Sequence, residues 1–207
     1  MKTIIVFNAP PNSGKDISCD YLVKNYGAYH TYFKKRLYEV AAMVAGINLE
    51  DMIKLATDRI QKEKPQSCFV VNETKYSPRQ WLIHVSENVV KPLLGKEYFG
   101  QHLSKEIWNA NNGLIVVSDG GFKEELLPLK DDPEFLMNPI QAKIHVVQLG
   151  RTGRSFVNDS RTYFDTDWLD EQEIQWSIII NNSTLEDLYE ELDYIMQQHK
   201  FPKKETK

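Results

Sequence analysis

Short apolar runs alternate along the chain with stretches that have helical periodicity. A β-rich run opens the chain at residues 2–8, and a continuous apolar run at 114–119 ends in a carboxylate, as a strand buried in a parallel sheet would. Runs of the same kind follow at 144–149 and 176–180, and residues 28–32 form a fifth candidate strand. This alternation of strands and helices predicts an α/β fold with a mainly parallel sheet.

Between the apolar runs, hydrophobic residues recur every three or four positions, the spacing of one helix face. Gly46 is a stop signal for one of these segments, and Ser77 followed by Pro78 is a start signal for another. The predicted helices are 17–25, 34–45, 49–62, 78–90, 97–108 and 185–198. We interpret the apolar stripe of the last helix as core, and residues 65–77 as a polar loop.

Composition narrows the class of protein. The 207 residues, 42% of them hydrophobic and 26% charged, suit one soluble globular domain. No apolar run approaches the roughly twenty residues of a membrane span, and no signal sequence opens the chain, so we expect a cytoplasmic protein without a membrane partner. A net charge of −4 argues against binding a nucleic-acid polymer. Cys19 and Cys68 are predicted to be reduced thiols, and the histidines show no metal or triad spacing.

The first strand leads into Ala9-Pro10-Pro11-Asn12-Ser13-Gly14-Lys15-Asp16, which is close to the phosphate-binding consensus G-x-x-x-x-G-K-[ST]. Ala9 replaces the first glycine and Asp16 replaces the hydroxyl residue. Gly14 keeps the backbone freedom, Lys15 keeps the charge for the terminal phosphates, and the following helix presents its positive N-terminus. The strand-loop-helix setting favours a nucleotide site over an ordinary turn, with these binding residues: Asn12, Ser13, Gly14 and Lys15.

Two carboxylates are candidates for a magnesium site. Asp119 ends the run 114–119, where a Walker B carboxylate would hold Mg²⁺ directly or through water; capping a segment that begins near Phe122 is the alternative. Asp16 beside a triphosphate would repel it unless a metal intervenes, so we predict a metal-facing or acceptor-orienting role. Favourable pairing with the helix N-terminus is its alternative.

Arginines can supply the positive charge that phosphoryl transfer needs. Arg79 opens the helix after Pro78, where its guanidinium suits either an acceptor phosphate or a surface salt bridge. Arg151 and Arg154 lie in a polar segment, 150–167, that also contains Arg161. The clustering of these arginines predicts a lid that closes over the reacting phosphates.

These motifs together resemble the P-loop deoxynucleoside monophosphate kinases of tailed bacteriophages, which are related more distantly to other nucleoside monophosphate kinases. Only the first motif is specific by itself, and the order of all four along most of the chain adds weight. The segments are Ser13-Gly14-Lys15-Asp16; Ser77-Pro78-Arg79-Gln80; Val116-Val117-Ser118-Asp119-Gly120-Gly121-Phe122, followed by Glu124 and Glu125; and Ile179-Ile180-Asn181-Asn182-Ser183-Thr184-Leu185. We interpret Glu124 and Glu125 as charges that complement a helix dipole; contact of one of them with the substrate sugar or the lid arginines is the alternative.

The resemblance implies a three-layer P-loop fold with a small lid. One kinase domain would cover 1–199, with an acceptor-binding helical region at about 34–110 and the lid at about 150–167. A basic, solvated tail, 200–207, would follow. The oligomeric state stays open between a monomer and a homodimer.

The activity that the resemblance implies is transfer of the γ-phosphoryl group of magnesium-bound ATP to a deoxynucleoside monophosphate, giving the diphosphate and ADP in the host cytoplasm. Lys15 would contact the donor phosphates and Arg79 the acceptor. Arg151 and Arg154 would belong to the lid, and Asn181 would lie near the adenine pocket.

Two other functions stay open at this stage. The pair Lys15-Asp16 also resembles the loop of animal-type phosphomevalonate kinases, which would make the chain a kinase of another small phosphorylated acceptor. The altered loop alternatively suggests a catalytically silent nucleotide-binding protein. The base preference and the choice between deoxyribose and ribose depend on pocket contacts that spacing does not reveal.

Overall fold

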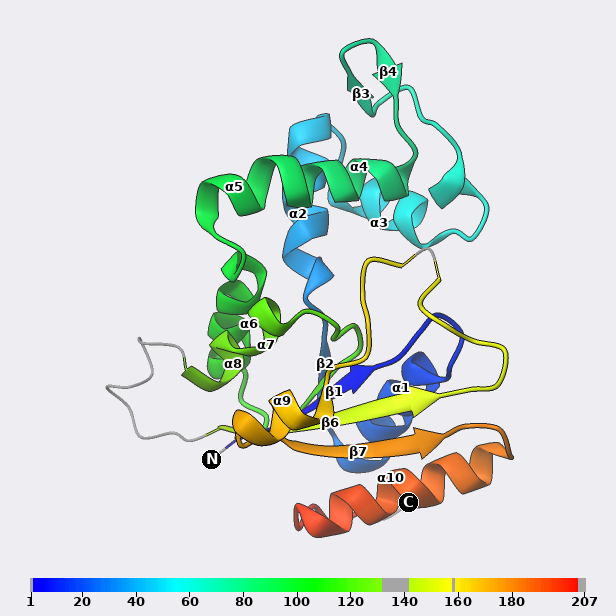
Figure 1. Cartoon of the computed structure of the whole chain (residues 1–207), viewed down its shortest axis with the longest axis vertical. Helices are drawn as coiled ribbons and strands as arrows, with labels where there is room; N and C mark the ends of the chain where they lie inside the picture. Colours follow the sequence, from blue (N-terminus) through cyan, green and yellow to red (C-terminus); the bar gives the residue numbers. More distant parts are fainter. Residues whose placement is uncertain (1, 132–141, 158, 205–207) are drawn as a thin grey trace.

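The computed structural model describes residues 2–131, 142–157 and 159–204. Its centre is a five-stranded sheet in the order β2-β5-β1-β6-β7, and every neighbouring pair is parallel (Figure 1). The strands are β1 (Lys2–Asn8), β2 (Tyr29–Thr31), β5 (Leu114–Val117), β6 (Ala142–Gly150) and β7 (Gln175–Ile180). The α/β prediction is confirmed, and all five strands fall where the sequence pattern places them.

Alternate residues of the central strand β1 serve the two faces of the sheet. Ile5 and Phe7 pack on one face, under α1 (Lys15–Tyr26) and α10 (Leu185–Gln198). Ile4 and Val6 pack on the other face, in the same cluster as residues of other helices. Those helices are α6 (Tyr98–Asn109), α7 (Lys123–Leu126), α8 (Pro128–Asp131) and α9 (Thr166–Glu171). The sheet therefore lies between two helical layers. In the described ranges no helix is both long and apolar enough to cross a membrane.

A helical region stands above the sheet in Figure 1 and has its own apolar core. Trp81 is at its centre: its ring stacks on Phe69 at 5.4 Å between centroids, and its Nε1 donates to the carbonyl of Ala41 at 3.0 Å. The region comprises α2 (Lys34–Ala45), α3 (Leu49–Thr57), a 3-10 turn (Gln61–Glu63), β3 (Val70–Val71), β4 (Thr74–Lys75), α4 (Pro78–His84), a π-helical stretch (Val85–Val90) and α5 (Lys91–Leu94). Its use for acceptor binding stays a prediction.

Two sequence-based boundaries in this region were wrong. The helix expected over 49–62 ends at Thr57, because Asp58 takes an extended conformation and its carboxylate accepts the backbone N–H groups of Ile60 and Gln61. The loop expected over 65–77 contains the short antiparallel hairpin of β3 and β4. By contrast, Ser77 and Pro78 start α4 with a capping box, as the sequence indicates.

The chain after α10 returns to α1 and is held there. Lys203 donates to Tyr21 at 2.6 Å and pairs with Asp193 at 2.8 Å, and the backbone N–H of Lys204 donates to the carbonyl of Asn25 at 2.7 Å. Phe201 packs on the core beneath. The segment is therefore held against α1, although residues 200 and 202–204 are exposed. A solvated tail stays a prediction, and 205–207 lie outside the described residues.

A buried histidine links β6 to β7 and to the residue after α10. The two ring nitrogens of His145 lie 2.8 Å from His199 Nε2 and 2.8 Å from Ser177 Oγ. Burial, and then the neighbouring His199, lower the pKa of His145 to about 4. The pKa of His199 is also lowered, by its own burial and by Lys143.

This pair predicts a loss of stability in mild acid. An unfolded histidine titrates near pH 6.5, so the contribution of His145 is complete above about pH 6.5 and falls as the pH drops toward 4. The pKa difference corresponds to about 3 kcal/mol of unfolding free energy. Urea titrations across this range should show a shallower acid slope in His145→Asn than in the wild type. His30→Asn, at an exposed position, should keep the wild-type slope; equal slopes in all three proteins would contradict the prediction.

Candidate functional site

The loop between β1 and α1 has the backbone shape of an anion cradle. Asn12 has φ +63° and Gly14 has φ +106°, both in the left-handed region, and Gly14 is the N-cap of α1 without a side-chain cap. The first N–H groups of a helix have no partner within the helix, so those of α1 are available to an anion. A phosphate group fits this arrangement.

Asn181, which follows β7, contacts the loop between β1 and α1. Its Nδ2 donates to the carbonyl of Ser13 at 3.0 Å, and a Cβ added to Gly14 would collide with the same nitrogen. Glycine is therefore required at position 14 for both its φ angle and its space. The structure thus places Asn181, 9% exposed, against the phosphate loop. Its contact with adenine stays a prediction.

Ser13 has a buried hydroxyl, and its Oγ has no hydrogen-bond partner among the described residues. Buried hydroxyls are normally paired, and an orphaned one marks a place where a bound group could complete the bonding. The next residues, Lys15 and Asp16, are half-buried and exposed respectively. The loop therefore offers a hydroxyl, a cation and a carboxylate within four positions, a donor set that suits a phosphate bound together with Mg²⁺.

Lys15 is the electrostatic centre of the site. Burial lowers the pKa of its ammonium group, while the charges of Asp16, Asp159 and Asp119 act in the opposite direction. Arg161 is the cation that influences it most. Lys15 thus belongs to a cluster of acids and bases at the carboxyl ends of β1 and β5, the edge where parallel α/β sheets bind ligands.

Asp119 joins the end of β5 to the start of α2. Its two carboxylate oxygens accept the backbone N–H groups of Phe33 at 2.8 Å and Lys34 at 3.1 Å. Asp119 therefore caps the start of α2. The alternative drawn from the sequence was a cap for the segment that begins near Phe122. A carboxylate oxygen with one hydrogen bond keeps a free lone pair, so magnesium binding by Asp119 and by Asp16 stays a prediction.

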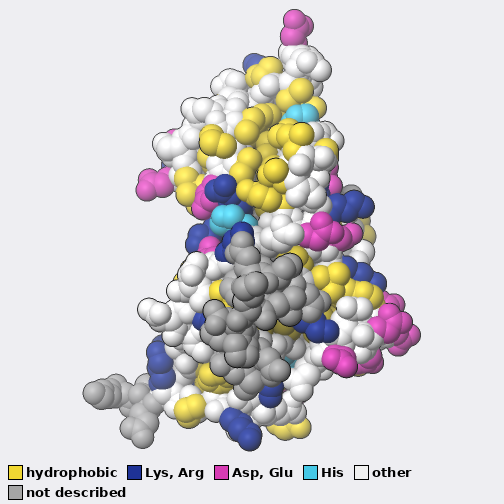
Figure 2. Space-filling model, turned by 90° about the vertical axis from the view of Figure 1, so that its left-hand side faces the viewer, with side chains coloured by type: hydrophobic (Ala, Val, Ile, Leu, Met, Phe, Trp, Pro, Cys, Tyr) yellow, Lys and Arg dark blue, Asp and Glu magenta, His cyan; other side chains and the backbone are white. Residues whose placement is uncertain are grey.

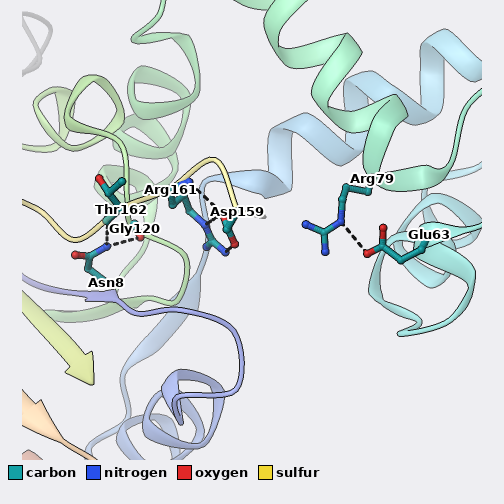
Figure 3. A network of polar contacts seen from close by, with 7 residues as sticks. All are labelled: Asn8, Glu63, Arg79, Gly120, Asp159, Arg161 and Thr162. Carbon is teal, nitrogen blue, oxygen red and sulfur yellow. Dashed lines mark hydrogen bonds and ion pairs between the residues drawn. The ribbon is translucent and has the colours of Figure 1, made fainter. Parts of the chain in front are cut away.

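Asn8, the last residue of β1, ties the segment around Arg161 to the sheet. Its side chain donates to the carbonyls of Gly120 at 3.1 Å and Thr162 at 2.9 Å (Figure 3). It also accepts the N–H of Phe164 at 2.9 Å. Gly121 makes room for the same segment, since a Cβ there would lie 2.7 Å from Arg161 Cβ. These contacts fix the position of Arg161.

Arg161 and Asp159 form a buried ion pair (Figure 3), and the charges of both act on the pKa of Lys15. Arg161 donates through Nε at 2.9 Å and through a terminal nitrogen at 2.6 Å to the two carboxylate oxygens. Burial by itself would raise the pKa of Asp159, but the hydrogen bonds and charge of Arg161 outweigh it and lower the pKa to about 2. The guanidinium is thereby oriented within the site.

Three further side chains belong to this cluster. Burial, then the charge of Arg161, lower the pKa of Lys34, and burial, then the charge of Asp119, raise the pKa of Tyr38 to about 12. Glu125 is buried beside the same charges. From the sequence, Glu125 is interpreted as a helix-dipole charge, with a sugar or arginine contact as its alternative, and Lys34 and Tyr38 are assigned no chemistry. Burial of a charged residue in a short helix or at a helix start has no signal in periodicity.

The three arginines predicted to act in transfer lie apart from this cluster. Arg79 pairs with Glu63 at 2.8 Å on the exposed surface of the helical region, the outcome offered as its alternative (Figure 3). Arg151 and Arg154 are exposed on the segment after β6. Within the described ranges no hydrogen bond or ion pair joins any of the three to the residues around Lys15. Their roles in binding acceptor or closing a lid stay predictions.

Two hollows lie at the amino ends of the strands, away from the loop. One of about 440 Å³ is lined by His145, Trp176 and their neighbours, and one of about 670 Å³ is lined by Tyr29, Glu106 and their neighbours. Neither includes a residue of the phosphate loop. We place the site at the carboxyl edge because the charges and the cradle are there. No group of three or more His, Cys, Asp and Glu side chains in the described part of the chain could hold a metal by itself.

No protein-family model and no curated protein matches the chain. Among solved structures, it is similar to a sugar kinase from a Janibacter species, with 10% identity over 97% of this chain and 95% of that one and a TM-score of 0.47. It is also similar to the protein TT1252 from Thermus thermophilus, with 15% identity over 95% of this chain and 97% of that one and a TM-score of 0.48.

Proposed function

We propose that the chain is an ATP-dependent kinase of a small phosphorylated acceptor, specifically a deoxynucleoside monophosphate. One observation carries the proposal: the loop before α1, which turns at the left-handed Gly14, lies in a cluster of charged side chains that contains Lys15, Lys34 and Arg161. Phosphoryl transfer requires positive charge placed around the moving group, and little covalent chemistry from the protein. The choice of a deoxynucleotide acceptor rests on the motif resemblance.

On the donor side, the N–H groups that open α1 and the Lys15 ammonium would bind the β- and γ-phosphates of ATP. Asp16 and Asp119 would hold Mg²⁺, which when bound neutralises phosphate charge. The hydroxyl of Ser13 has no partner in the described structure and could donate a hydrogen bond to a phosphate oxygen. Asn181 keeps the loop in shape through the Ser13 carbonyl.

On the acceptor side, Lys34 and Arg161 are the cations that already lie within the cluster. Arg79 projects from the helical region, and Arg151 and Arg154 from the segment after β6, so a closing motion would be needed to add them. Asn182 Oδ1 accepts the N–H of Thr152 at 2.8 Å, which holds the start of the segment after β6 next to Asn181. If this segment closes over the site, it would move about that held end.

The test is ADP formation from magnesium-ATP in the presence of each deoxynucleoside monophosphate, each ribonucleoside monophosphate and mevalonate 5-phosphate. We expect turnover with at least one deoxynucleotide. Turnover with mevalonate 5-phosphate alone would assign another acceptor. ATP binding without acceptor-dependent ADP formation would instead indicate a silent nucleotide-binding protein.

A further inference from the structure

Two buried side-chain amides lie next to each other at the carboxyl ends of β1 and β6. Asn8 and Gln148 are register partners in the parallel ladder, and their exposed fractions are 0% and 6%. Two positions earlier on each strand, Val6 and Val146 belong to the apolar core on one face of the sheet, and side chains two apart in a strand share a face. Apolar residues would suffice for packing there, whereas a buried amide is costly unless it is hydrogen-bonded. The two amides therefore indicate a specific bonding role.

Both amides bind the backbone of Phe164, which lies in the segment after β6. Asn8 Oδ1 accepts its N–H at 2.9 Å, and Gln148 Nε2 donates to its carbonyl at 2.7 Å. Asn8 also donates to the carbonyl of Thr162 at 2.9 Å. The hydroxyl of Tyr163, which lies between them in sequence, donates to the backbone of β6 at 2.8 Å. Three consecutive residues are therefore bonded to the two strands, and a fully satisfied polar network of this kind makes a segment rigid.

Arg161 directly precedes these three residues and has little freedom left. Its side chain packs on Gly121, where an added Cβ would lie 2.7 Å from Arg161 Cβ and 2.7 Å from its Cγ. Its guanidinium bonds to both carboxylate oxygens of Asp159, and its exposed fraction is 6%. Gly121 follows β5, and Asn8 ends β1 directly before the phosphate loop (Figure 3). Arg161 is therefore held at the carboxyl edge of the sheet.

We propose that Asn8 and Gln148 are positioning residues, which hold the guanidinium of Arg161 in place for the acceptor phosphate before the acceptor binds. The inference rests on the proposed kinase function, in which Arg161 is an acceptor-side cation, and adds to it the two residues that hold this cation. Charge that is placed in advance needs no reorganisation during the reaction, so it stabilises the transition state more than a mobile charge does. The two amides act only through Arg161.

The experiment is a double-mutant cycle between each amide and Arg161. Asn8→Leu and Gln148→Leu are made in the wild type and in Arg161→Lys, which keeps a cation but loses the paired hydrogen bonds. In the wild type each should lower kcat/KM for the acceptor by about 10- to 100-fold, the loss that a misplacement of about 1 Å can cause, with KM for ATP within about threefold. In Arg161→Lys each should lower it by about threefold or less, because the group that they position is already lost.

Asn112→Leu is the matched control. Its amide also donates to a distant backbone carbonyl, that of Gly27 at 3.1 Å, but Asn112 lies before β5, at the amino ends of the strands. This variant should keep the wild-type kcat/KM. Gln148→Leu removes the bond to the Phe164 carbonyl alone, so it tests the proposal even if Asn8→Leu does not fold.

Four outcomes would overturn the inference. Equal losses of kcat/KM in the two backgrounds would show that the amides act independently of Arg161. A loss of the same size in Asn112→Leu would show a general effect of stability, and wild-type kcat/KM in folded Gln148→Leu would show that its bond is structural. These three leave the kinase proposal standing, because the wild type turns over in each. Absence of turnover by the wild type on every acceptor would remove the kinase proposal, and this inference with it.

Discussion

Replacing Lys15 with alanine is expected to lower kcat by about 10²–10³-fold, the loss typical of removing one preorganised donor that stabilises transition-state charge. Lys15 lies at the start of α1, directly after the left-handed Gly14, and its ammonium is partly desolvated among acids. Desolvation strengthens the interaction with developing phosphate charge. The measurement is the steady-state rate of ADP formation at saturating magnesium-ATP and acceptor.

Lys24→Ala is the matched control for Lys15→Ala. Lys24 is an exposed lysine in the last turn of the same helix, so its loss changes the net charge equally without touching the loop. It should retain wild-type activity, and circular dichroism should show that both variants are folded. Full activity in folded Lys15→Ala would remove the donor-site assignment.

Replacing Asp159 with alanine is expected to destabilise the fold by about 3–5 kcal/mol, because it leaves the Arg161 guanidinium buried without its counter-charge. The side chains of Arg161 and Asp159 are only 7% and 11% exposed. Thermal and urea unfolding of the variant measure the loss. A change below about 1 kcal/mol would contradict the view that this pair is buried in solution.

Glu63→Ala provides the comparison, since it removes the acid from an ion pair of similar length with Arg79. That pair is exposed, at 39% and 52% for its two side chains, so its loss should cost about 1 kcal/mol or less. The two ion pairs have similar N···O distances, 2.8 Å and 2.6 Å, and differ mainly in exposure. The difference in unfolding free energy lost by the two variants therefore tests the effect of burial.

The same pair predicts a pH effect in strong acid. Asp159 has a pKa of about 2 in the fold and about 3.8 in the unfolded chain, so its contribution is present above about pH 4 and is lost as the pH falls toward 2. The difference corresponds to about 2 kcal/mol. This acid window lies below that of His145, so the two contributions can be separated in one titration.

The fold class could be predicted from the sequence because strands and helix starts depend on residues that are close together in the chain. Residues 114–117 are all apolar, as is typical of a strand covered on both faces, and Ser77-Pro78 specified a helix start that the structure reproduces. The helix over 49–62 was placed too long because Asp58 turns the chain through side-chain bonds to the backbone. Such bonds leave little trace in hydrophobic periodicity.

The site was predictable only in part. Gly14 and Lys15 could be predicted because the motif is contiguous in sequence and its chemistry depends on adjacent backbone groups. The structure shows the left-handed turn at Gly14, while the roles of Lys15, Asp16, Arg79 and the lid arginines stay predictions. Asn181 lies far from the loop in sequence, and only the strand order of the sheet brings it beneath Ser13.

The sequence by itself determined the alternation of strands and helices, the phosphate loop and the glycine at its turn, because each depends on residues within a few positions of one another. The tertiary structure decided which distant charges meet that loop. Arg161, Lys34 and Glu125 come from three separate elements, and they converge because parallel strands bring their carboxyl ends to one edge. Burial then set their protonation and pairing, and burial is a property of the packed molecule rather than of any local pattern.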